Sequence, residues 1–196
     1  MATMTEDGRA SWIKPGSEFP DFELPDENGE RHRLSELQGE YAMVLMLGRG
    51  EHCPRERQQQ REMLKFYEWC SVAFTELVTV LPNELHDVFK LKISTGAHWT
   101  WLADTELEMQ TALDIREYTD PIHDANVPHT LVLSPGLKIE SVYVGYWFWG
   151  RPSPYQLWED LQNVSRRIKQ DFDPTTVEAR AAWEEATRNG AVPAHR

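Results

Sequence analysis

The sequence predicts an α/β protein in which helices flank a central mixed sheet. In residues 41–113, short apolar runs alternate with amphipathic segments, and this pattern is typical of strands joined by helical crossovers. Later, two apolar runs are joined by the tight turn Ser134-Pro135-Gly136, which indicates an antiparallel pair. A sheet that contains both kinds of connection must be mixed.

The N-terminal region is expected to lie outside the repeating pattern. Residues 1–12 are small and charged without periodicity, so we expect them to be disordered. Residues 19–29 alternate apolar and polar side chains and end in Asn28-Gly29, a strong hairpin signal. Residues 34–39 form a short helical turn that stops at a glycine.

The remaining elements are expected in the order strand, helix, strand, helix, strand, helix, strand, strand, helix, with one more helix at the end. Strands are expected at residues 41–47, 72–81, 99–103, 130–133 and 139–146. Helices are expected at residues 54–69, 84–93, 106–113, 153–169 and 175–188. Because the sequence contains no repeat and no composition break, we expect one domain over residues 13–170, followed by a C-terminal helix and tail over 171–196.

The helix after the first of these strands has two different halves. Its first half, residues 55–62, is almost wholly polar. Its second half places Met63, Leu64, Tyr67 and Cys70 at roughly helical spacing, so these are its expected core residues. Cys70 follows Trp69 on this apolar face and is therefore interpreted as a core residue.

Composition excludes several classes of function. The 196 residues suffice for one domain with a sizeable core. A net charge of −12 without a basic patch argues against nucleic acid as a partner. No apolar run approaches the roughly 20 residues that cross a bilayer, so no membrane partner is expected. The polar N-terminus lacks a signal core, and two cysteines are too few for a disulfide scaffold, so the sequence predicts a cytoplasmic location.

The junction around Cys53 is the part of the sequence that best indicates chemistry. An apolar strand at 41–47 leads into a glycine-rich turn, a cysteine, and Pro54 at the expected first helical position. Cys53 is therefore expected at or near the N-cap, where the helix macrodipole favours a thiolate.

Charged neighbours act on Cys53 in both directions. Arg49, His52 and Arg55 favour the thiolate, whereas Glu51 and Glu56 oppose it. We interpret Cys53 as a functional thiol, and the alternative is a small structural residue in a turn.

Three motifs make the chain resemble a known family. They are residues 19–29 followed by Leu34-Ser35-Glu36-Leu37; Arg49-Gly50 with Cys53-Pro54 and Gln58; and residues 127–133 with Gly136. Over about residues 14–168 the chain resembles the peroxiredoxin-like group (alkyl hydroperoxide reductase and thiol-specific antioxidant proteins) of the thioredoxin-fold superfamily. The resemblance implies a thioredoxin-like fold with an N-terminal extension and an extra C-terminal helix.

The resemblance also implies an antioxidant enzyme. The Cys53 thiolate would attack a peroxide or another small oxidant and become a sulfenic acid. An external thiol would then reduce it, and no cofactor is implied. A homodimer is a family-based expectation. The alternative is a non-catalytic thioredoxin-fold module that binds a thiol, a peptide or another ligand.

The chain departs from the family pattern at three places. Glu56 stands where thioredoxins have their second cysteine, so the local disulfide cannot form. Gly50 stands where peroxiredoxins usually have a Thr or Ser, and Pro128 stands where they usually have an Arg before the late strand. Arg49, Arg55 and Arg151 are the candidate replacements, with Arg49 and Arg55 expected to act in catalysis beside Cys53.

The resemblance places other residues near the thiol. Since the late strand carries the cis-proline of thioredoxin folds, we expect a cis Val127–Pro128 bond and a position for Pro128 opposite Cys53. His129 would then bind a thiolate or substrate together with His52, and the alternative is a surface histidine on a strand edge.

The aromatic run at residues 146–149 has two readings. Trp147 and Trp149, with Arg151 after them, would line an organic substrate or form a dimer surface. Alternatively, the rings pack under the helix of residues 153–169.

The other sites that the sequence offers are weaker. The histidines have no zinc-type spacing, so no metal site is expected, although one assembled across loops from His52, His123 and His129 stays open. No Cys53–Cys70 disulfide is expected, since 17 residues of helix separate them by about 25 Å.

Overall fold

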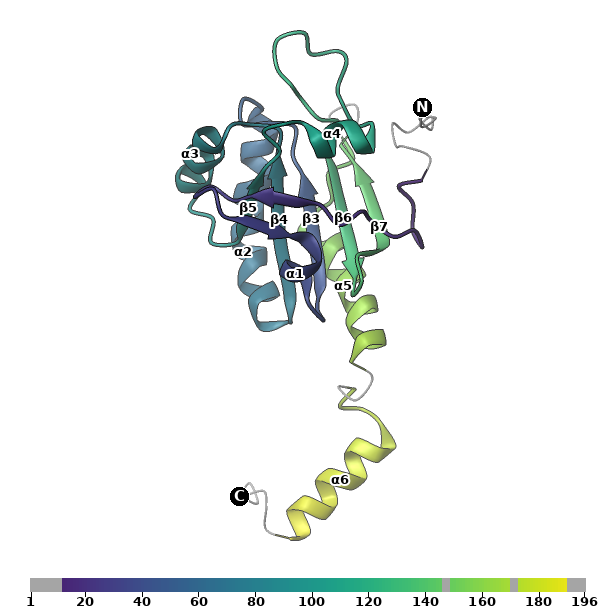
Figure 1. The fold of residues 1–196 in the computed structure, drawn as a ribbon. Helices are drawn as coiled ribbons and strands as arrows, with labels where there is room; N and C mark the ends of the chain where they lie inside the picture. The colour runs from purple at the N-terminus through teal and green to yellow at the C-terminus, as the bar shows by residue number, and fades with distance from the viewer. Residues whose placement is uncertain (1–11, 146–148, 170–172, 190–196) are drawn as a thin grey trace. The chain divides into compact units, whose positions relative to one another are not determined.

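A five-stranded mixed sheet forms the centre of the computed structural model, which describes residues 12–145, 149–169 and 173–189. The strand order is β5-β4-β3-β6-β7, with β3 parallel to β4 and antiparallel to β6 (Figure 1). The strands are β3 (Ala42–Leu47), β4 (Thr75–Leu81), β5 (Thr100–Ala103), β6 (His129–Ser134) and β7 (Lys138–Val144). The expected mixed α/β architecture with a thioredoxin-like sheet is confirmed.

The central strand β3 is buried along its whole length. Its six residues are all apolar because both faces of the sheet are covered. Met43, Leu45 and Leu47 belong to one core cluster with Leu24 and Leu34 from the N-terminal region. That region is the two-stranded hairpin of β1 (Glu23–Pro25) and β2 (Arg31–Arg33), followed by α1 (Leu34–Gln38), as the Asn28-Gly29 signal predicted. In Figure 1 this hairpin crosses in front of the sheet.

The other face of the sheet is covered by α2 (Pro54–Val72). Met63, Phe66 and Cys70 are buried along this helix. Leu64 and Tyr67, which the sequence assigned to the core, are half-buried, whereas Phe66 is 2 % exposed. Phe66 therefore takes the buried position that the sequence assigned to Tyr67, one residue later.

The helices α3 (Leu85–Thr95), α4 (Glu108–Leu113), α5 (Pro154–Ile168) and α6 (Val177–Arg188) complete the described chain. The Asp104 carboxylate accepts the backbone N–H groups of Met109 and Gln110 at 3.1 and 2.8 Å, as expected of a residue that caps α4. Ser153 Oγ accepts the Gln156 N–H at 3.3 Å and so caps α5.

The chain divides into two compact units, residues 1–161 and 162–196. The strands and the core cluster that contains Met43, Leu45 and Leu47 belong to the first. In the second, Thr176 Oγ1 accepts the Ala179 N–H at 3.1 Å, which fixes the start of α6 as predicted. None of the α6 residues is buried. The domain limits predicted at residues 13–170 and 171–196 stay predictions.

The largest differences from the predicted boundaries are at the end of α2 and the start of β4. Val72 ends α2 instead of starting a strand, and β4 begins only at Thr75. The chain turns between them at Phe74, whose positive φ of 51° fits neither a helix nor a strand. The expected strand end at Tyr146 and the expected disorder of residues 1–11 lie outside the described residues. Within the described ranges, no helix is long and apolar enough to cross a membrane.

Candidate active site around Cys53

Cys53 is the N-cap residue of α2, and Pro54 follows it in the first turn, as the sequence predicted. The Cys53 N–H donates to the Gly50 carbonyl at 3.2 Å, and the Cys53 carbonyl accepts the Arg57 N–H at 3.3 Å. The Cys53 residue is 7 % exposed. The thiol therefore lies at the positive end of a long helix and in a largely covered place.

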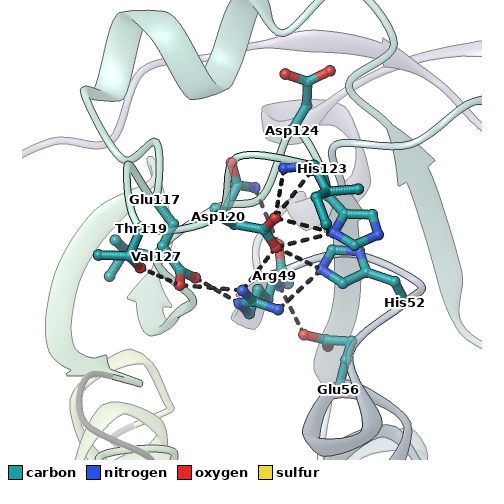
Figure 2. A network of polar contacts seen from close by, with 12 residues as sticks. Arg49, His52, Glu56, Glu117, Thr119, Asp120, His123, Asp124 and Val127 are labelled. Carbon is teal, nitrogen blue, oxygen red and sulfur yellow. Dashed lines mark hydrogen bonds and ion pairs between the residues drawn. The ribbon is translucent and has the colours of Figure 1, made fainter.

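Arg49 is the best-held cation of the site (Figure 2). Its Nε and Nη2 donate to the two carboxylate oxygens of Glu117 at 2.5 and 3.1 Å. Nη2 also donates to Asp120 Oδ2 at 2.9 Å, and Nη1 donates to His52 Nε2 at 2.9 Å. Three side chains from two segments thus fix one planar guanidinium, which is geometry that a lysine could not reproduce.

The Arg49 guanidinium also interacts with Cys53. The hydrogen bond that Arg49 donates to Glu117 is the largest cause that raises the pKa of Arg49, and a hydrogen bond and charge attraction with Cys53 act in the same direction. In return, Arg49 lowers the pKa of the Glu117 carboxyl. Arg49 therefore places a permanent positive charge near the thiol, and the Glu117 carboxylate holds the guanidinium in position.

The His52 imidazole occupies the space beside Gly50. A Cβ placed on Gly50 would lie 2.8 Å from His52 Cε1 and 2.9 Å from His52 Nδ1, so the ring would have to move to admit a larger residue. The φ of Gly50, +141°, is also one that L side chains rarely adopt. Gly50 stands where peroxiredoxins usually carry Thr or Ser, so the histidine ring takes up the room of that side chain.

The His52 ring is stacked on the ring of His123, with centroids 3.7 Å apart and planes 4° from parallel. Burial is the largest cause that lowers the pKa of His52, and the nearby His123 and Arg49 act in the same direction. Since an arginine can only donate, the contact from Arg49 Nη1 requires an unprotonated His52 Nε2. His52 is thus a neutral imidazole that accepts at Nε2.

Glu56 is a fully buried carboxylate directly below the turn. Its Oε2 accepts the Arg49 N–H at 2.8 Å and Arg151 Nη2 at 3.0 Å, and its Oε1 accepts Gln60 Nε2 at 2.8 Å. A Cβ on Gly48 would lie 2.7 Å from Glu56 Cδ, so this glycine leaves the room for the carboxylate. Glu56 therefore joins the Cys53 turn, α2 and Arg151 in one buried ion pair.

Two neighbouring glutamines extend this polar layer. Gln59 contacts Arg151 and donates to Thr130 Oγ1 at 3.0 Å. Gln60 Oε1 accepts Thr79 Oγ1–H at 3.2 Å. The first half of α2 is thus half buried, and Gln59 and Gln60 have hydrogen-bond partners on the sheet.

The expected cis bond at Pro128 is wrong, because the described chain has no cis peptide bond. The Val127 N–H donates to the Ile115 carbonyl at 2.7 Å and the Pro128 carbonyl accepts the Gly145 N–H at 2.7 Å. These bonds hold an extended path into β6, which the ordinarily preferred trans bond continues. A Cβ on Gly145 would lie 2.6 Å from Pro128 Cγ and 3.3 Å from Arg151 Cγ, so Pro128 and Arg151 are neighbours.

His129 is buried in β6, at 1 % exposure, and its Nδ1 lies 2.7 Å from the Val127 carbonyl. The alternative of a surface histidine is therefore wrong. His129 pairs in register with Leu47, the last residue of β3, and so lies at the strand end from which the Cys53 turn begins.

The other expected site residues are more scattered. Arg55 lies exposed in the first turn of α2. Trp149 is 80 % exposed, so it does not pack under α5, and Trp147 lies outside the described residues. Cys70 is a free, buried cysteine on the same continuous helix as Cys53, which agrees with the interpretation of Cys70 as a core residue.

Glu117, Asp120 and the role of Glu56 were missed from sequence. Glu117 and Asp120 lie in the long loop between α4 and β6, where no periodicity indicates which side chains point inward. Glu56 had a usable signal, since it precedes buried Gln59, Gln60 and Met63 at helical spacing.

A family model described as "AhpC/TSA family" matches residues 15–142. The chain belongs to the AhpC/TSA family. The thiol-disulfide oxidoreductase ResA of Bacillus subtilis (strain 168) is 28 % identical over 138 residues, which are 68 % of this chain and 69 % of ResA.

Among solved structures, the peroxidoxin BcpB of Mycobacterium tuberculosis superposes with a TM-score of 0.65 at 17 % identity, over 80 % of this chain and 99 % of that one. Reduced Prx3 of Vibrio vulnificus gives a TM-score of 0.68 at 15 % identity, over 76 % and 99 %. The family and its relatives indicate an enzyme, a thiol oxidoreductase with the thioredoxin fold.

Proposed function

We propose that this protein is a thiol peroxidase that uses Cys53 as its single reactive cysteine. The observation that carries the proposal is the fixed position of the Arg49 guanidinium, which is held by Glu117, Asp120 and His52 and interacts electrostatically with Cys53. A fixed cation beside a thiol at a helix N-cap favours the thiolate, and a thiolate is the nucleophile that peroxide reduction needs.

In the proposed reaction, the Cys53 sulfur attacks one oxygen of the peroxide and the O–O bond breaks. The sulfur is oxidised to a sulfenic acid, and the second oxygen leaves as hydroxide or alkoxide and takes up a proton. An external thiol then forms a mixed disulfide with Cys53 and releases water. A second thiol reduces that disulfide and restores Cys53. Cys70 cannot resolve the sulfenic acid, because it lies about 25 Å away along α2.

Arg49 is the proposed electrostatic group, since it combines permanent charge, fixed geometry and contact with the thiol. Arg151 is committed to buried Glu56, so we propose a positioning role for it below the turn. Substrate contacts by His52, Pro128, His129, Trp147 and Trp149, catalysis by Arg55, a homodimer and a cytoplasmic location stay predictions.

Thiol–disulfide exchange is a second candidate, supported by the 28 % identity to ResA. Against it stands the buried carboxylate of Glu56 at the place of a second cysteine, so any exchange here would use one cysteine. A binding module that has lost redox chemistry is the third.

One set of measurements separates the three candidates. The reduced protein is mixed with hydrogen peroxide and, separately, with an alkyl hydroperoxide, and sulfenic acid is trapped with dimedone. We expect fast labelling of Cys53, complete loss of thiol-dependent peroxide consumption in Cys53→Ser and retention in Cys70→Ser. Arg49→Lys should slow oxidation by about 10–100-fold, a loss on the scale of one fixed charge-assisted contact.

One outcome would contradict the proposal, and two further results would then choose between the other candidates. Peroxide consumption no faster than that of a free thiol, with dithiothreitol, glutathione and thioredoxin each supplied, would remove the peroxidase. Rapid reaction of the same protein with a mixed disulfide would then favour exchange. Failure of both reactions would favour the binding module.

A further inference from the structure

His52, Asp120 and His123 converge on one small volume beside the Cys53 turn (Figure 2). One potential ligand atom from each residue lies within 4.8 Å of the other two. We propose that His52 Nε2, His123 Nδ1 and Asp120 Oδ2 bind a divalent cation of the zinc class.

The distances fit a tetrahedral ion. With metal–ligand bonds of about 2.0–2.1 Å, the edges of a tetrahedron measure about 3.4 Å. His52 Nε2 lies 3.4 Å from Asp120 Oδ2, and His123 Nδ1 lies 3.0 Å from the same oxygen. Two imidazoles and one carboxylate leave a fourth position for water, and this donor set suits zinc and cobalt better than magnesium or calcium.

The Asp120 carboxylate is oriented for this role by the backbone. Its Oδ1 accepts the N–H groups of Ile122 and His123 at 3.0 and 3.1 Å, which leaves Oδ2 directed at the two rings. Ligand carboxylates in metal sites are typically held by such hydrogen bonds. The Asp120 side chain is 9 % exposed, so the site is partly shielded from solvent.

Ion binding requires one ring to turn. The two imidazoles are 4° from parallel, and lone pairs in parallel planes do not meet at a single ion. The side chain of His123 is 42 % exposed against 17 % for His52, so His123 has the room to rotate. A modest rotation of His123 brings its lone pair toward the point that His52 Nε2 and Asp120 Oδ2 already face.

A cation already occupies the same acceptors. Arg49 donates to His52 Nε2 and to Asp120 Oδ2, each at 2.9 Å. A bound ion must replace these two hydrogen bonds, whereas the two bonds from Arg49 to Glu117 can remain. Two carboxylates, Glu117 and Asp120, surround this one guanidinium, so the site keeps a negative balance that tolerates a second cation.

The described residues offer one comparable cluster, Asp26, Glu30 and His32 on the β1–β2 hairpin. It has a single imidazole, so it offers one nitrogen ligand where the proposed site offers two. This cluster supplies the matched control, because His32→Ala removes a histidine of the same kind without touching the proposed site.

The test is a zinc titration of the reduced full-length protein against a chromophoric chelator, repeated with cobalt to read coordination from its visible spectrum. We expect one equivalent per chain with a tetrahedral cobalt spectrum. Loss of a residue that only hydrogen-bonds to a metal ligand lowers metal affinity by about 10–100-fold. Because His123→Ala and Asp120→Asn remove proposed ligands themselves, each should weaken zinc binding by about 100-fold or more. His32→Ala and Cys53→Ser should bind as the wild type does, and Arg49→Gln should bind more tightly because a competing cation is gone.

Several results would overturn the site. These are no binding by the wild type, binding that survives both His123→Ala and Asp120→Asn, binding lost in His32→Ala, or binding lost in Cys53→Ser, which would identify the thiolate as the ligand. Weaker binding by Arg49→Gln would contradict the shared acceptors. Circular dichroism confirms that each variant is folded, and His123 is exposed enough for its replacement to be tolerated. Zinc binding does not depend on peroxide reduction, so each proposal can fail without the other.

Discussion

Replacing Glu56 by glutamine tests the buried ion pair under the Cys53 turn. In the wild type, Oε2 accepts two donors, Arg49 N–H and Arg151 Nη2, and Oε1 accepts Gln60 Nε2. An amide group in either orientation turns at least one accepting oxygen into a donor that faces another donor. The better orientation keeps the bonds from the Arg49 N–H and Arg151, now to a neutral oxygen, and loses the Gln60 bond.

The cost follows from those contacts. Hydrogen bonds to a charged group contribute about 1.5–3 kcal/mol each, and breaking one partner of a buried ion pair costs about 3–5 kcal/mol. We therefore expect Glu56→Gln to lower the free energy of unfolding by about 4 kcal/mol. For a protein of this size that corresponds to a fall of about 8–16 °C in Tm.

Urea denaturation of the wild type and Glu56→Gln measures this loss. Glu62→Gln is the matched control, because Glu62 is an exposed glutamate on the same helix, and its effect should stay within about 0.5 kcal/mol. In a double-mutant cycle with Arg151→Met, the two changes should couple strongly, since each removes the other's partner. A loss below about 1 kcal/mol for Glu56→Gln, or strict additivity in the cycle, would refute the buried pair.

Three further predictions concern other parts of the chain. Gly50→Ala should destabilise the protein by about 1–3 kcal/mol more than Gly16→Ala in urea denaturation. A Cβ on Gly50 would meet the His52 ring at 2.8 Å, whereas nothing lies within 4 Å of a Cβ on Gly16. Equal losses of stability would contradict the close contact. Burial raises the pKa of Cys70 from 9.0 to about 12, so native protein at pH 8 should alkylate at Cys70 only after unfolding, as peptide mapping can show. Since the unfolded thiol ionises first, Cys70 also makes stability fall as the pH rises above about 9, and a stability that is flat there in Cys53→Ser would contradict the raised pKa. Thr176→Ala should remove the cap of α6 at a cost of about 1 kcal/mol, seen as roughly fivefold faster hydrogen exchange of the Ala179 amide, and unchanged exchange would mean that the cap does not hold the helix.

Local patterns predicted most of the fold because the local and tertiary preferences agree. The run at residues 42–47 is apolar on both sides and lies at the centre of the sheet. Asn28-Gly29 forms the expected hairpin turn, and Cys53-Pro54 begins the expected helix. Each of these features depends on residues that are close in sequence.

Polar residues in α2 were harder to place. Residues 55–62 look solvated by composition, yet Glu56, Gln59 and Gln60 are buried. Their spacing continues the stripe of Met63, so the periodicity contained the information. Composition was misleading because the partners, Thr79, Thr130 and Arg151, come from other elements.

The carboxylates that hold Arg49 could not be predicted at all. Glu117 and Asp120 stand 68 and 71 residues after Arg49. The loop that carries them has no period, so its path depends on contacts such as the Asn126 N–H bond to the Arg49 carbonyl at 3.1 Å. A charged loop of this kind reads from sequence as a solvated surface.

Two of the three departures from the family pattern, at Gly50 and Pro128, become understandable when spatial neighbours are compared instead of sequence neighbours. At Gly50 the missing hydroxyl residue makes room for the ring of His52, two positions later. At Pro128, where that pattern has an arginine, the stem of Arg151 lies beside the proline against Gly145. Arg151 is paired with Glu56, whereas Arg49 interacts electrostatically with Cys53, so the two guanidinium groups lie in different surroundings. A position-by-position comparison therefore finds two missing residues, whereas the folded chain places Arg49 near the thiol and Arg151 beneath the Cys53 turn.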